Sequence, residues 1–530
     1  MVMDLDRLNV RDFLDAAIRE VPDEPFLIWE DAPISYAAFG ERVDRAANAW
    51  HRLGIRKGDR VAFMVDNAPA FLEAWLGLAK IGGILSAVNT GFTAEEAAAQ
   101  IGHSEPSLIL VSAAHGDVIG NVAERVPGIR ILQLGANERF EDFTALIDAA
   151  EPVAPPVELR GDDVISLIYT SGTTGRSKAV MQTHRAFVLT GQAYPTWLDI
   201  RRGDRQYVCL PYFHINSQAY STMGAIGARS TIVLVPRFSA SRFWPEVRRH
   251  RVTHFNFIGA MTVILSRAAV TPEDADNEVR VAYGGTKLPY ELQMEVERRF
   301  GLRIISGFGM SETTFGMIED VHGYRRPGSI GKPRQHPDPA VPRNEARLVD
   351  DAGTDVGPDE VGELLLRNPT MALGYFRDPE RTAETFRDGW LHTGDLLRRD
   401  ADGFHFFVDR KKDVIRRRGE NISSVEVERV LAEHPDVGYV SIVGVPSELT
   451  DEEVLAYVVP RPGTTIDPPA LLAFARERLA RFKIPRYVRV VEDLPRTGSH
   501  KVRKELLRED WRQPDLYDHE AGSPDGPGRG

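Results

Sequence analysis

The feature that most constrains the fold is a repeated alternation of short β-branched runs with helical stretches over the first 330 residues. Segments 36–53 and 289–300 carry apolar residues at helical spacing, and each is followed by a glycine, Gly54 or Gly301. Strands separated by such helices predict parallel sheets with right-handed crossovers, which is an α/β architecture. The predicted strands are Val61–Val65, Leu108–Val111, Ile131–Leu134, Val164–Tyr169, Thr231–Val235, Thr253–Ile258, Val279–Tyr283 and Arg303–Ile305.

The pattern changes in the last third of the chain. Turns and short strands dominate from about residue 331 to 408, which predicts a small β unit. Helical and strand patterns then alternate again, which predicts a compact α+β domain. We expect a large domain of stacked α/β subdomains over 1–409 that includes the β unit, a small domain over 410–515, and a disordered tail over 516–530, where glycine and proline prevent packing.

Composition excludes several classes of protein. With 65 basic and 77 acidic residues the net charge is −12, which argues against binding to nucleic acid or to an anionic membrane. Cys209 is the single cysteine, so the chain forms no internal disulfide, and its apolar neighbours predict an inert core thiol. The apolar stretch 71–88 is interrupted by Glu73 and Lys80, and no secretory leader is apparent. We expect a cytoplasmic protein without a membrane span.

A polar loop follows the apolar run 164–169. Its two glycines allow backbone N–H groups to approach an anion, and its hydroxyls and cations supply further donors, so it suits a polyphosphate. The GxxxxGK[ST] spacing of a Walker A loop is absent. A plain connecting loop is the alternative interpretation. The loop reads Thr170-Ser171-Gly172-Thr173-Thr174-Gly175-Arg176-Ser177-Lys178.

This loop and several later blocks, in the same order, resemble the adenylate-forming superfamily of acyl-CoA synthetases, peptide-synthetase adenylation domains and luciferases. The resemblance covers about residues 10 to 510. Within the superfamily it is nearest to the carnitine/crotonobetaine-CoA ligase group, through segments 53–59, 243–244 and 418–421. The blocks are Pro211–His214, Tyr283–Leu288, Gly307–Thr314, Gly362–Leu364, Gly389–Asp395, Asp409–Asp413, Gly419–Ile422 and Pro495–Thr497 ahead of Lys501.

The resemblance implies an ATP-dependent ligase that joins a small carboxylic acid to coenzyme A. The carboxylate attacks the α-phosphate of ATP, pyrophosphate leaves, and the acyl-adenylate then gives a thioester. Cations, backbone donors and Mg²⁺ are needed to stabilise charge on the phosphoryl group. The implied cofactors are ATP, Mg²⁺ and coenzyme A. The sequence does not determine whether the protein is a monomer or a homodimer.

The same resemblance assigns residues to the nucleotide. The polar loop holds the β- and γ-phosphates, and two glycine-rich segments pass along the adenine. Glu312 matches the Mg²⁺ ligand of the family. Asp395 matches the carboxylate that binds both ribose hydroxyls, and Arg410 supports it. The expected nucleotide-binding residues are Thr170, Ser171, Gly172, Thr173, Thr174, Gly175, Lys178, Gly284, Gly285, Thr286, Gly307, Phe308, Gly309, Met310, Ser311, Asp395 and Arg410.

Catalysis and domain movement are also implied by the resemblance. Lys501 bridges the substrate carboxylate and the α-phosphate as a compact point charge. His214 lies at the carboxylate end of the acyl pocket, and Glu312 and Thr173 complete the catalytic set. Lys412 is the hinge about which the small domain swings. The swing presents a loop that lines the pantetheine tunnel, with Gly419, Glu420 and Asn421, and the run 416–418 is a candidate for the phosphates of coenzyme A.

Three positions depart from the usual family pattern: Ser177, Ala179 and His500. The first two alter loop stiffness, and His500 replaces a flexible glycine beside the catalytic lysine. Two other functions therefore stay open. In the first, the enzyme forms the adenylate but passes the activated group to a carrier protein or a nitrogen nucleophile. In the second, the chain binds a nucleotide without turnover.

The expected acyl pocket is rich in aromatic and small residues. Its predicted wall comprises residues 212–223, 255–259 and 315–316. No carboxylate is available there to pair with a quaternary ammonium group, although aromatic faces could accept one. An aryl acid or a short acyl acid fits equally well.

Overall fold

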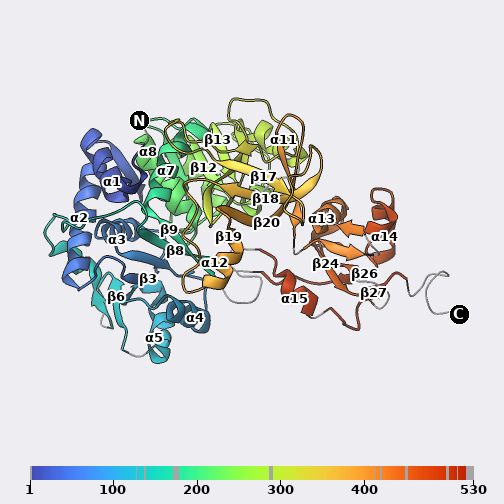
Figure 1. Ribbon diagram of the computed structural model, residues 1–530, viewed down its shortest axis with the longest axis horizontal. Coiled ribbons are helices and arrows are strands. Elements are labelled where there is room, and N and C mark those ends of the chain that lie inside the picture. Colours follow the sequence, from blue (N-terminus) through green and yellow to red (C-terminus); the bar gives the residue numbers. More distant parts are fainter. Residues whose placement is uncertain are drawn as a thin grey trace. The chain divides into compact units, whose positions relative to one another are not determined.

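The structure is a computed structural model (Figure 1) that describes residues 3–126, 128–136, 139–170, 178–285, 290–411, 413–417, 420–447, 452–496, 501–509 and 511–520. The chain divides into two compact units. The first comprises residues 1–346, 365–392 and 403–405, and the second comprises 347–364, 393–402 and 406–530.

A seven-stranded sheet forms one layer of the first unit. Every neighbouring pair is parallel except the last, which is an antiparallel hairpin at one edge. Its inner strands are continuous apolar runs, as expected where helices cover both faces. The order is β7 (Glu141–Asp142), β6 (Arg130–Leu134), β5 (Leu108–Ser112), β3 (Arg60–Met64), β4 (Ile84–Ala87), β8 (Val164–Thr170) and β9 (Lys178–Thr183).

A nine-stranded sheet forms the second layer. Its central strands run parallel, and antiparallel strands close both edges. All eight strands predicted from the sequence are present in the two sheets, so the α/β prediction is confirmed. The order is β16 (Lys332–Pro333), β15 (Thr313–Ile318), β14 (Arg303–Met310), β13 (Val281–Gly284), β12 (His254–Phe257), β10 (Arg205–Val208), β11 (Thr231–Leu234), β1 (Pro25–Trp29) and β2 (Ala32–Ser35).

Helices cover these sheets, and several of them begin at a capping side chain. The Ser35 side chain accepts from the N–H of Ala38, and Thr93 forms a reciprocal capping box with Glu96. The helices of this unit are η1 (Leu5–Arg7), α1 (Val10–Glu20), α2 (Tyr36–Arg52), α3 (Pro69–Lys80), α4 (Ala94–Ser104), η2 (Ala113–His115), α5 (Gly116–Arg125), α6 (Phe143–Asp148), α7 (His184–Leu198), η3 (Asn216–Thr222, a π-helix), α8 (Met223–Ala228), α9 (Ala240–Arg249), α10 (Gly259–Ser266), α11 (Tyr290–Phe300) and α12 (Pro379–Thr385).

The apolar stretch 71–88 belongs to the core. It forms most of α3 and then β4, and α3 is buried from Phe71 to its end. The Lys80 ammonium lies 2.6 Å from carboxylate oxygens of both Asp15 and Asp44, which compensate its buried charge. Within the described residues, no helix is both long enough and apolar enough to cross a bilayer.

Cys209 directly follows β10 and is buried. Burial raises the pKa of its thiol to about 12, so the nucleophilic thiolate does not form near neutral pH. The prediction of an inert core thiol is confirmed.

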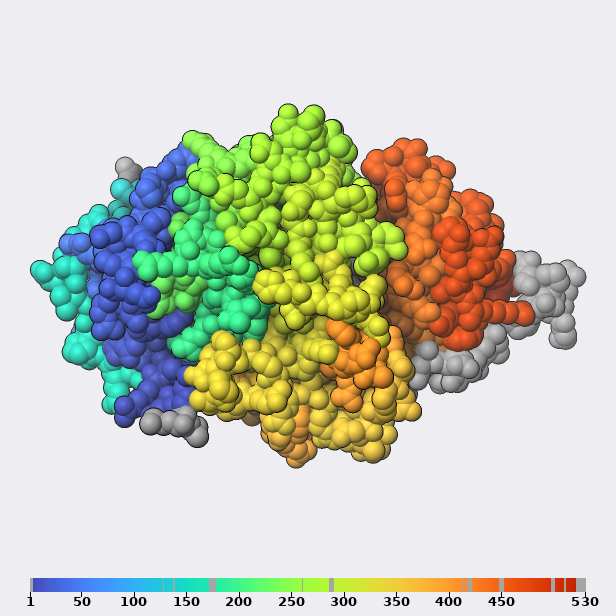
Figure 2. Space-filling view, turned by 90° about the horizontal axis from the view of Figure 1, so that it is seen from above, coloured from blue at the N-terminus to red at the C-terminus, as the bar shows by residue number. Residues whose placement is uncertain are grey.

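The N-terminal segment packs directly against α7. Figure 2 shows the blue N-terminal residues beside the green segment on one face of this unit. At the contact, the backbone N–H of Val10 donates to Nδ1 of the buried His184 at 3.2 Å. A ring that accepts at Nδ1 is neutral and carries its proton on Nε2. Burial lowers the pKa of His184 to about 4.

This histidine predicts a loss of stability in mild acid. An unfolded histidine has a pKa near 6.5, so the folded chain binds the proton less readily than the unfolded chain. The contribution of His184 is therefore complete above about pH 6.5 and is lost as the pH falls towards 4. The two pKa values correspond to ~3 kcal/mol of unfolding free energy. Urea unfolding between pH 7 and 4 measures it.

The control is His184→Asn, whose side-chain oxygen can still accept from Val10 but does not titrate. We expect a shallower pH dependence for this variant. Parallel curves for the two proteins would contradict the assignment.

The predicted β unit is a five-stranded sheet. Its path runs through β17 (Glu345–Val349), β18 (Val361–Arg367), β20 (Trp390–Arg399) and β19 (Phe386–Arg387), and β21 (His405–Arg410) also pairs with β20.

The second unit carries the predicted small α+β domain. A four-stranded sheet packs against helices around a core that includes Val427, Ala456 and Leu472. Its elements are β22 (Ile415–Arg417), β23 (Glu420–Ile422), α13 (Ser424–Ala432), β24 (Val437–Pro446), β25 (Glu452–Pro460), α14 (Pro468–Arg476), η4 (Arg481–Lys483), β26 (Tyr487–Val490), α15 (Lys504–Glu509) and β27 (Tyr517–Asp518).

The prediction of a disordered tail from residue 516 is wrong for residues 516–520. Tyr517 and Asp518 pair antiparallel with β26. The Asp518 carboxylate lies 3.1 Å from Arg486, and Glu520 lies 3.2 Å from Arg417. The edge strand β26 offers backbone groups for pairing, and Arg486 and Arg417 bind the acidic side chains of these residues. The composition of the tail reveals neither partner.

Candidate active site

The polar loop connects the two strands of the β8–β9 hairpin. Thr170 ends β8 and pairs in register with Lys178, the first residue of β9. The other predicted phosphate contacts, Ser171, Gly172, Thr173, Thr174 and Gly175, and also Ser177, lie outside the described residues. The hairpin therefore fixes both ends of the loop at one edge of the seven-stranded sheet.

A buried tyrosine links this hairpin to the predicted metal ligand. The Lys178 ammonium lies 4.6 Å from the centre of the Tyr375 ring, within cation–π range. The Tyr375 hydroxyl donates to Oε1 of Glu312 at 2.7 Å. Tyr375 is 3% exposed and Glu312 is 7% exposed. One phenol thus contacts a cation through its face and a carboxylate through its edge.

Backbone hydrogen bonds hold this arrangement in place. The segment around Tyr375 lies along β9, because the N–H of Phe376 donates to the carbonyl of Ala179 at 2.8 Å and the N–H of Met181 donates to Gly374 at 3.0 Å. The N–H of Ala372 donates to the carbonyl of Glu312 at 2.8 Å. Ala179, one of the family departures, is therefore buried inside a backbone ladder.

The electrostatics keep the phenol a donor. Burial and, after it, the charge of Glu312 raise the pKa of Tyr375 well above its ordinary value. Oε2 of Glu312 accepts no hydrogen bond from the residues that the structure describes. Mg²⁺ is commonly held by one or two carboxylates together with phosphate oxygens and waters, so a single available carboxylate oxygen fits it. The described residues contain no cluster of three or more His, Cys, Asp or Glu that could hold a metal by itself.

Glu312 lies in the turn of a second hairpin. Met310 pairs with Thr313 across β14 and β15, which leaves Ser311 and Glu312 as the turn. The Ser311 carbonyl accepts from the Gln182 side chain on β9 at 2.5 Å. Because Glu312 is buried in this turn, it is not an exposed glutamate that caps a helix. The predicted adenine segment Gly307, Phe308, Gly309 and Met310 forms the end of β14.

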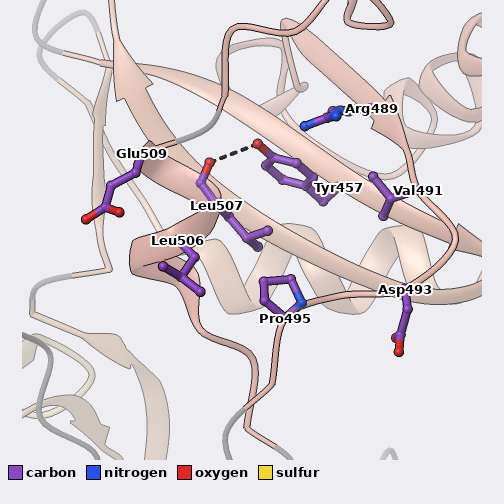
Figure 3. A pocket seen from close by; sticks show the side chains of 8 residues that line it. All are labelled: Tyr457, Arg489, Val491, Asp493, Pro495, Leu506, Leu507 and Glu509. Carbon is purple, nitrogen blue, oxygen red and sulfur yellow. Dashed lines mark hydrogen bonds between the residues drawn. The ribbon is translucent and has the colours of Figure 1, made fainter. Parts of the chain in front are cut away.

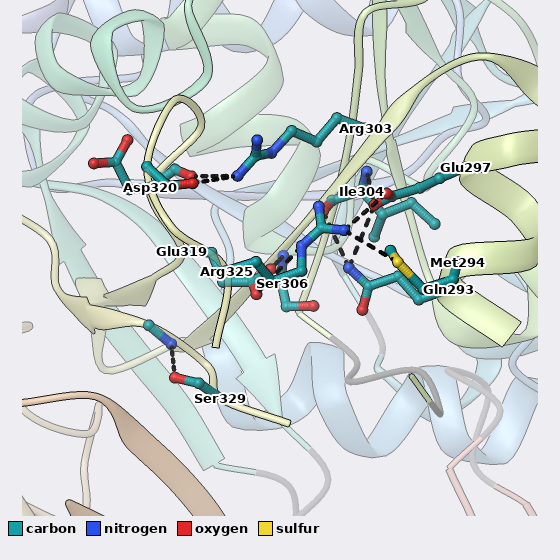
Figure 4. A network of polar contacts seen from close by, with 12 residues as sticks. Gln293, Met294, Glu297, Arg303, Ile304, Ser306, Glu319, Asp320, Arg325 and Ser329 are labelled. Carbon is teal, nitrogen blue, oxygen red and sulfur yellow. Dashed lines mark hydrogen bonds and ion pairs between the residues drawn. The ribbon is translucent and has the colours of Figure 1, made fainter. Parts of the chain in front are cut away.

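A polar network holds the first half of β14 (Figure 4). Oε1 of Glu297 accepts from the N–H of Ile304 at 2.8 Å, and Oε2 pairs with Arg325 at 2.7 Å. The buried Glu319 accepts from the N–H of Ser306 at 2.7 Å. These bonds position the strand immediately before Gly307.

The other glycine-rich segment follows the neighbouring strand. Gly284 ends β13, Gly285 follows it, and Thr286 lies outside the described residues. Because β13 and β14 are adjacent and parallel, with Gly284 paired to Ser306, the two glycine segments emerge at the same edge of the sheet.

His214 lies in the turn between β10 and the π-helix η3. Its N–H donates to the carbonyl of Pro211 at 3.2 Å, and its ring lies 4.5 Å from that of Phe213. π-Helices are rare and are often found at functional sites. The predicted pocket wall 212–223 is therefore largely this helix.

The predicted ribose ligand lies in the second unit. Asp395 is 5% exposed, and its Oδ1 lies 3.3 Å from Nε of Arg410. The preceding turn is fixed by Glu363, which accepts from the N–H of Gly394 at 3.2 Å and pairs with Lys411 at 3.1 Å. The carboxylate is thus positioned by neighbours from β18, β20 and β21.

Lys501 is exposed and lies on a hairpin of the second unit. Arg496 and Val502 form a β-bridge, and the N–H of Arg503 donates to the carbonyl of Pro495 at 2.8 Å. His500 lies outside the described residues. Behind the hairpin is a cavity of about 310 Å³ (Figure 3), where the Tyr457 hydroxyl donates to the Leu507 carbonyl at 2.8 Å. Its lining residues are Tyr457, Arg489, Val491, Asp493, Pro495, Leu506, Leu507 and Glu509.

The predicted hinge and tunnel residues are only partly described. Lys412 and Gly419 lie outside the described residues, and the backbone of Glu420 and Asn421 forms β23. Arg417, a candidate for binding coenzyme A phosphates, is 4% exposed and pairs with Glu453 at 2.5 Å. That expectation is wrong for Arg417, because its charge is already neutralised inside the domain.

Sequence reasoning missed Tyr375. The only local signal is the block Gly374-Tyr375-Phe376 in a turn-rich segment, which does not indicate a partner. Its partners lie 63 positions earlier, at Glu312, and in another sheet, at Lys178.

Comparison with known proteins identifies the family. Residues 14–376 match the model of the AMP-binding enzyme family, and residues 426–501 match that of the AMP-binding enzyme C-terminal domain. The chain belongs to the AMP-binding enzyme family.

Individual relatives are similar over nearly the whole chain. A crotonobetaine/carnitine–CoA ligase of Salmonella heidelberg (strain SL476) is 34% identical over 519 residues, which are 94% of this chain and 99% of the relative. The anthranilate CoA ligase AuaEII in complex with anthranoyl-AMP has a TM-score of 0.86 and 25% identity, and covers 96% of this chain and 98% of its own. The o-succinylbenzoate coenzyme A synthetase MenE of Bacillus subtilis with ATP and magnesium has a TM-score of 0.82, 27% identity, and coverage of 94% and 98%.

Proposed function

We propose that the protein is an AMP-forming ligase that activates a small carboxylic acid with ATP and transfers the acyl group to coenzyme A. The observation that carries the proposal is the cluster of Lys178, Tyr375 and Glu312. It places a cation at the end of the polar loop beside a buried carboxylate suited to Mg²⁺. The relatives named as CoA ligases favour coenzyme A as the acceptor.

The chain's own residues have distinct tasks in the first half-reaction. Lys178 and the polar loop bind the β- and γ-phosphates, and Glu312 holds Mg²⁺, which supplies positive charge to the phosphate oxygens. Asp395 binds the ribose hydroxyls, with Arg410 fixing its orientation. Lys501 neutralises the carboxylate and the α-phosphate as they approach, and His214 lies at the carboxylate end of the acid pocket.

The second half-reaction needs a different arrangement. Lys501 and the predicted pantetheine loop, which includes Gly419, Glu420 and Asn421, belong to the same small domain. A swing about Lys412 would exchange the lysine for that loop, so that one domain serves both steps. The cytoplasmic location is still a prediction from the sequence alone, and the choice between a monomer and a homodimer is open.

Two measurements separate the candidate functions. Pyrophosphate exchange over a panel of carboxylic acids detects adenylate formation, and a nucleotide-binding protein without turnover gives none. Coenzyme A, a carrier protein or an amine is then added to the preformed adenylate, and the product is identified by mass spectrometry. Discharge by coenzyme A is expected. Exchange without discharge by coenzyme A would instead support transfer to a carrier or a nitrogen nucleophile.

Replacing Tyr375 by phenylalanine is expected to weaken the response to Mg²⁺. The variant keeps the ring beside Lys178 but removes the hydrogen bond to Glu312. Loss of a hydrogen bond to a charged group changes an equilibrium constant by roughly tenfold or more. We expect the Mg²⁺ concentration at half-maximal pyrophosphate exchange to rise by about that factor. Initial rates at saturating ATP measure it.

Tyr207→Phe is the matched control, because Tyr207 donates to Glu246 at 2.6 Å in an equivalent Tyr–Glu pair between β10 and α9. It should lower the unfolding temperature without changing the Mg²⁺ response. An equal change in both variants would show that Tyr375 acts through stability alone.

A further inference from the structure

Arg334 is a buried cation held among aromatic rings. It follows β16, is 1% exposed, and is one of the largest fully buried side chains in the described structure. Its guanidinium carbon lies 5.2 Å from the ring centres of Trp197 and Tyr220 and 5.3 Å from that of Tyr283. Three aromatic faces around one cation form an aromatic cage, the arrangement that proteins use to bind quaternary ammonium groups. In this chain the cage already contains a cation.

The hydrogen bonds of Arg334 use only neutral acceptors. Nε donates to the carbonyl of Met317 at 3.1 Å, and Nη1 donates to the Tyr220 hydroxyl at 2.8 Å and the Thr314 carbonyl at 3.0 Å. Nη2 donates to the Tyr283 hydroxyl. Among the described residues no carboxylate forms an ion pair with Arg334, so its positive charge is not neutralised by them.

Two hydrogen-bond donors in this cluster, one N–H of Arg334 and the O–H of Tyr283, have no acceptor among the described residues. A guanidinium has five N–H groups, and the described acceptors account for four of them. The Tyr283 hydroxyl accepts from Nη2, but its own proton has no acceptor among the described residues. Burial raises the pKa of Tyr283 to about 12, so that proton is retained. Because buried donors nearly always have a partner, a further acceptor is expected beside Arg334 and Tyr283.

These donors adjoin the predicted acyl pocket. Tyr220 lies on the π-helix η3, and Tyr283 immediately precedes Gly284. The backbone N–H of Arg334 donates to the carbonyl of Gly316 at 2.9 Å. A side chain added at Gly307 would come within 2.7 Å of Nη2, so only glycine permits this approach. Arg334 therefore contacts two of the segments that are expected to enclose the acid, 212–223 through its guanidinium at Tyr220 and 315–316 through its backbone at Gly316.

We infer that the acid carries a hydrogen-bond acceptor at the end distal to its reacting carboxylate, and that Arg334 and Tyr283 bind this acceptor. A quaternary ammonium acid is excluded, because it would meet a buried charge of the same sign in a cage that is already occupied. The inference rests on the proposed function, and it separates this chain from relatives named for crotonobetaine and carnitine.

The test compares acids that differ only at the distal end. A butanoate and a benzoate are prepared with a carboxylate, a tert-butyl or a trimethylammonium group at that end, and the same three groups are placed on whichever acid of the panel the enzyme activates best. Pyrophosphate exchange gives kcat/KM for each. We expect the carboxylate to exceed the neutral tert-butyl group by at least about tenfold, since charge-assisted hydrogen bonds are of this strength. The tert-butyl group should exceed the isosteric trimethylammonium group by a similar factor.

Variants then assign the effect to Arg334. Arg334→Met should remove the preference for the distal carboxylate and raise the relative activity with the cationic acid. Arg334→Lys keeps the positive charge, so the carboxylate acid should still be preferred to the tert-butyl acid, and the tert-butyl acid to the trimethylammonium acid. The wild-type ratios decide the inference even where a variant fails to fold. It is overturned if the cationic acid is activated as well as its neutral isostere, or if the acceptor gives no advantage, as when buried water satisfies the two donors. Absence of exchange with every acid would instead overturn the proposed function.

Discussion

Replacing Lys501 by alanine is expected to lower the rate of adenylate formation by roughly 10²–10³-fold, the typical cost of removing a group that stabilises transition-state charge. In the proposed first half-reaction the ammonium lies between two anions, the carboxylate and the α-phosphate, which otherwise repel each other. Pyrophosphate exchange measures this step. Thioester formation from a synthetic acyl-adenylate and coenzyme A should stay close to wild type, because the proposed domain swing carries Lys501 out of the site before this step.

Arg503→Ala is the local control. Arg503 lies two positions further on the same hairpin and pairs with Glu505 at 3.2 Å, while its backbone closes the hairpin on Pro495. The control should retain both half-reactions. Equal losses of both steps in Lys501→Ala would contradict the proposed division between them.

Replacing Glu312 by glutamine is expected to lower pyrophosphate exchange by roughly 10²-fold or more, with a higher Mg²⁺ requirement. The amide oxygen can still accept from Tyr375, so the 2.7 Å hydrogen bond and the packing are retained while the charge is lost. A neutral oxygen is a weaker ligand for a hard divalent cation. Initial rates over a series of Mg²⁺ concentrations, together with thermal unfolding, measure the two effects separately.

Glu319→Gln is the matched control for this charge. Glu319 is as buried as Glu312, at 7% exposure, and accepts from the N–H of Ser306, and burial raises its pKa. We expect a change in stability without a change in the Mg²⁺ requirement. The role of Glu312 is contradicted if its variant keeps the wild-type Mg²⁺ response.

Local pattern was sufficient to predict eight of the sixteen strands in the two large sheets. Buried parallel strands are short apolar runs bounded by helices, so β3, β5, β6, β8, β11, β12, β13 and β14 were each recognisable. The antiparallel partners β9 and β15 were not, because each follows a polar turn and has mixed composition. The strand β27 was also missed, since residues 516–520 depend on an edge of β26 for their hydrogen bonds.

The residues of the candidate site were predicted from family resemblance and not from local pattern. Family resemblance suggested roles for Glu312, Asp395 and Lys178, and the structure shows how each side chain is held. It also raised the three-arginine run as a phosphate site, yet Arg417 is paired with Glu453 inside the domain. A run of charges does not reveal which member is buried, because burial depends on elements elsewhere in the chain.

The sequence by itself determined the order of strands and helices and the family to which the chain belongs, because both are recorded in local periodicity and in short blocks of residues. Only the tertiary structure decided that Tyr375 joins Lys178 to Glu312 and that Arg334 occupies an aromatic cage. Tyr375 and Glu312 are 63 positions apart, and Arg334 and Tyr220 are 114 apart. Such contacts arise where sheets and helices pack, so no stretch of sequence contains them.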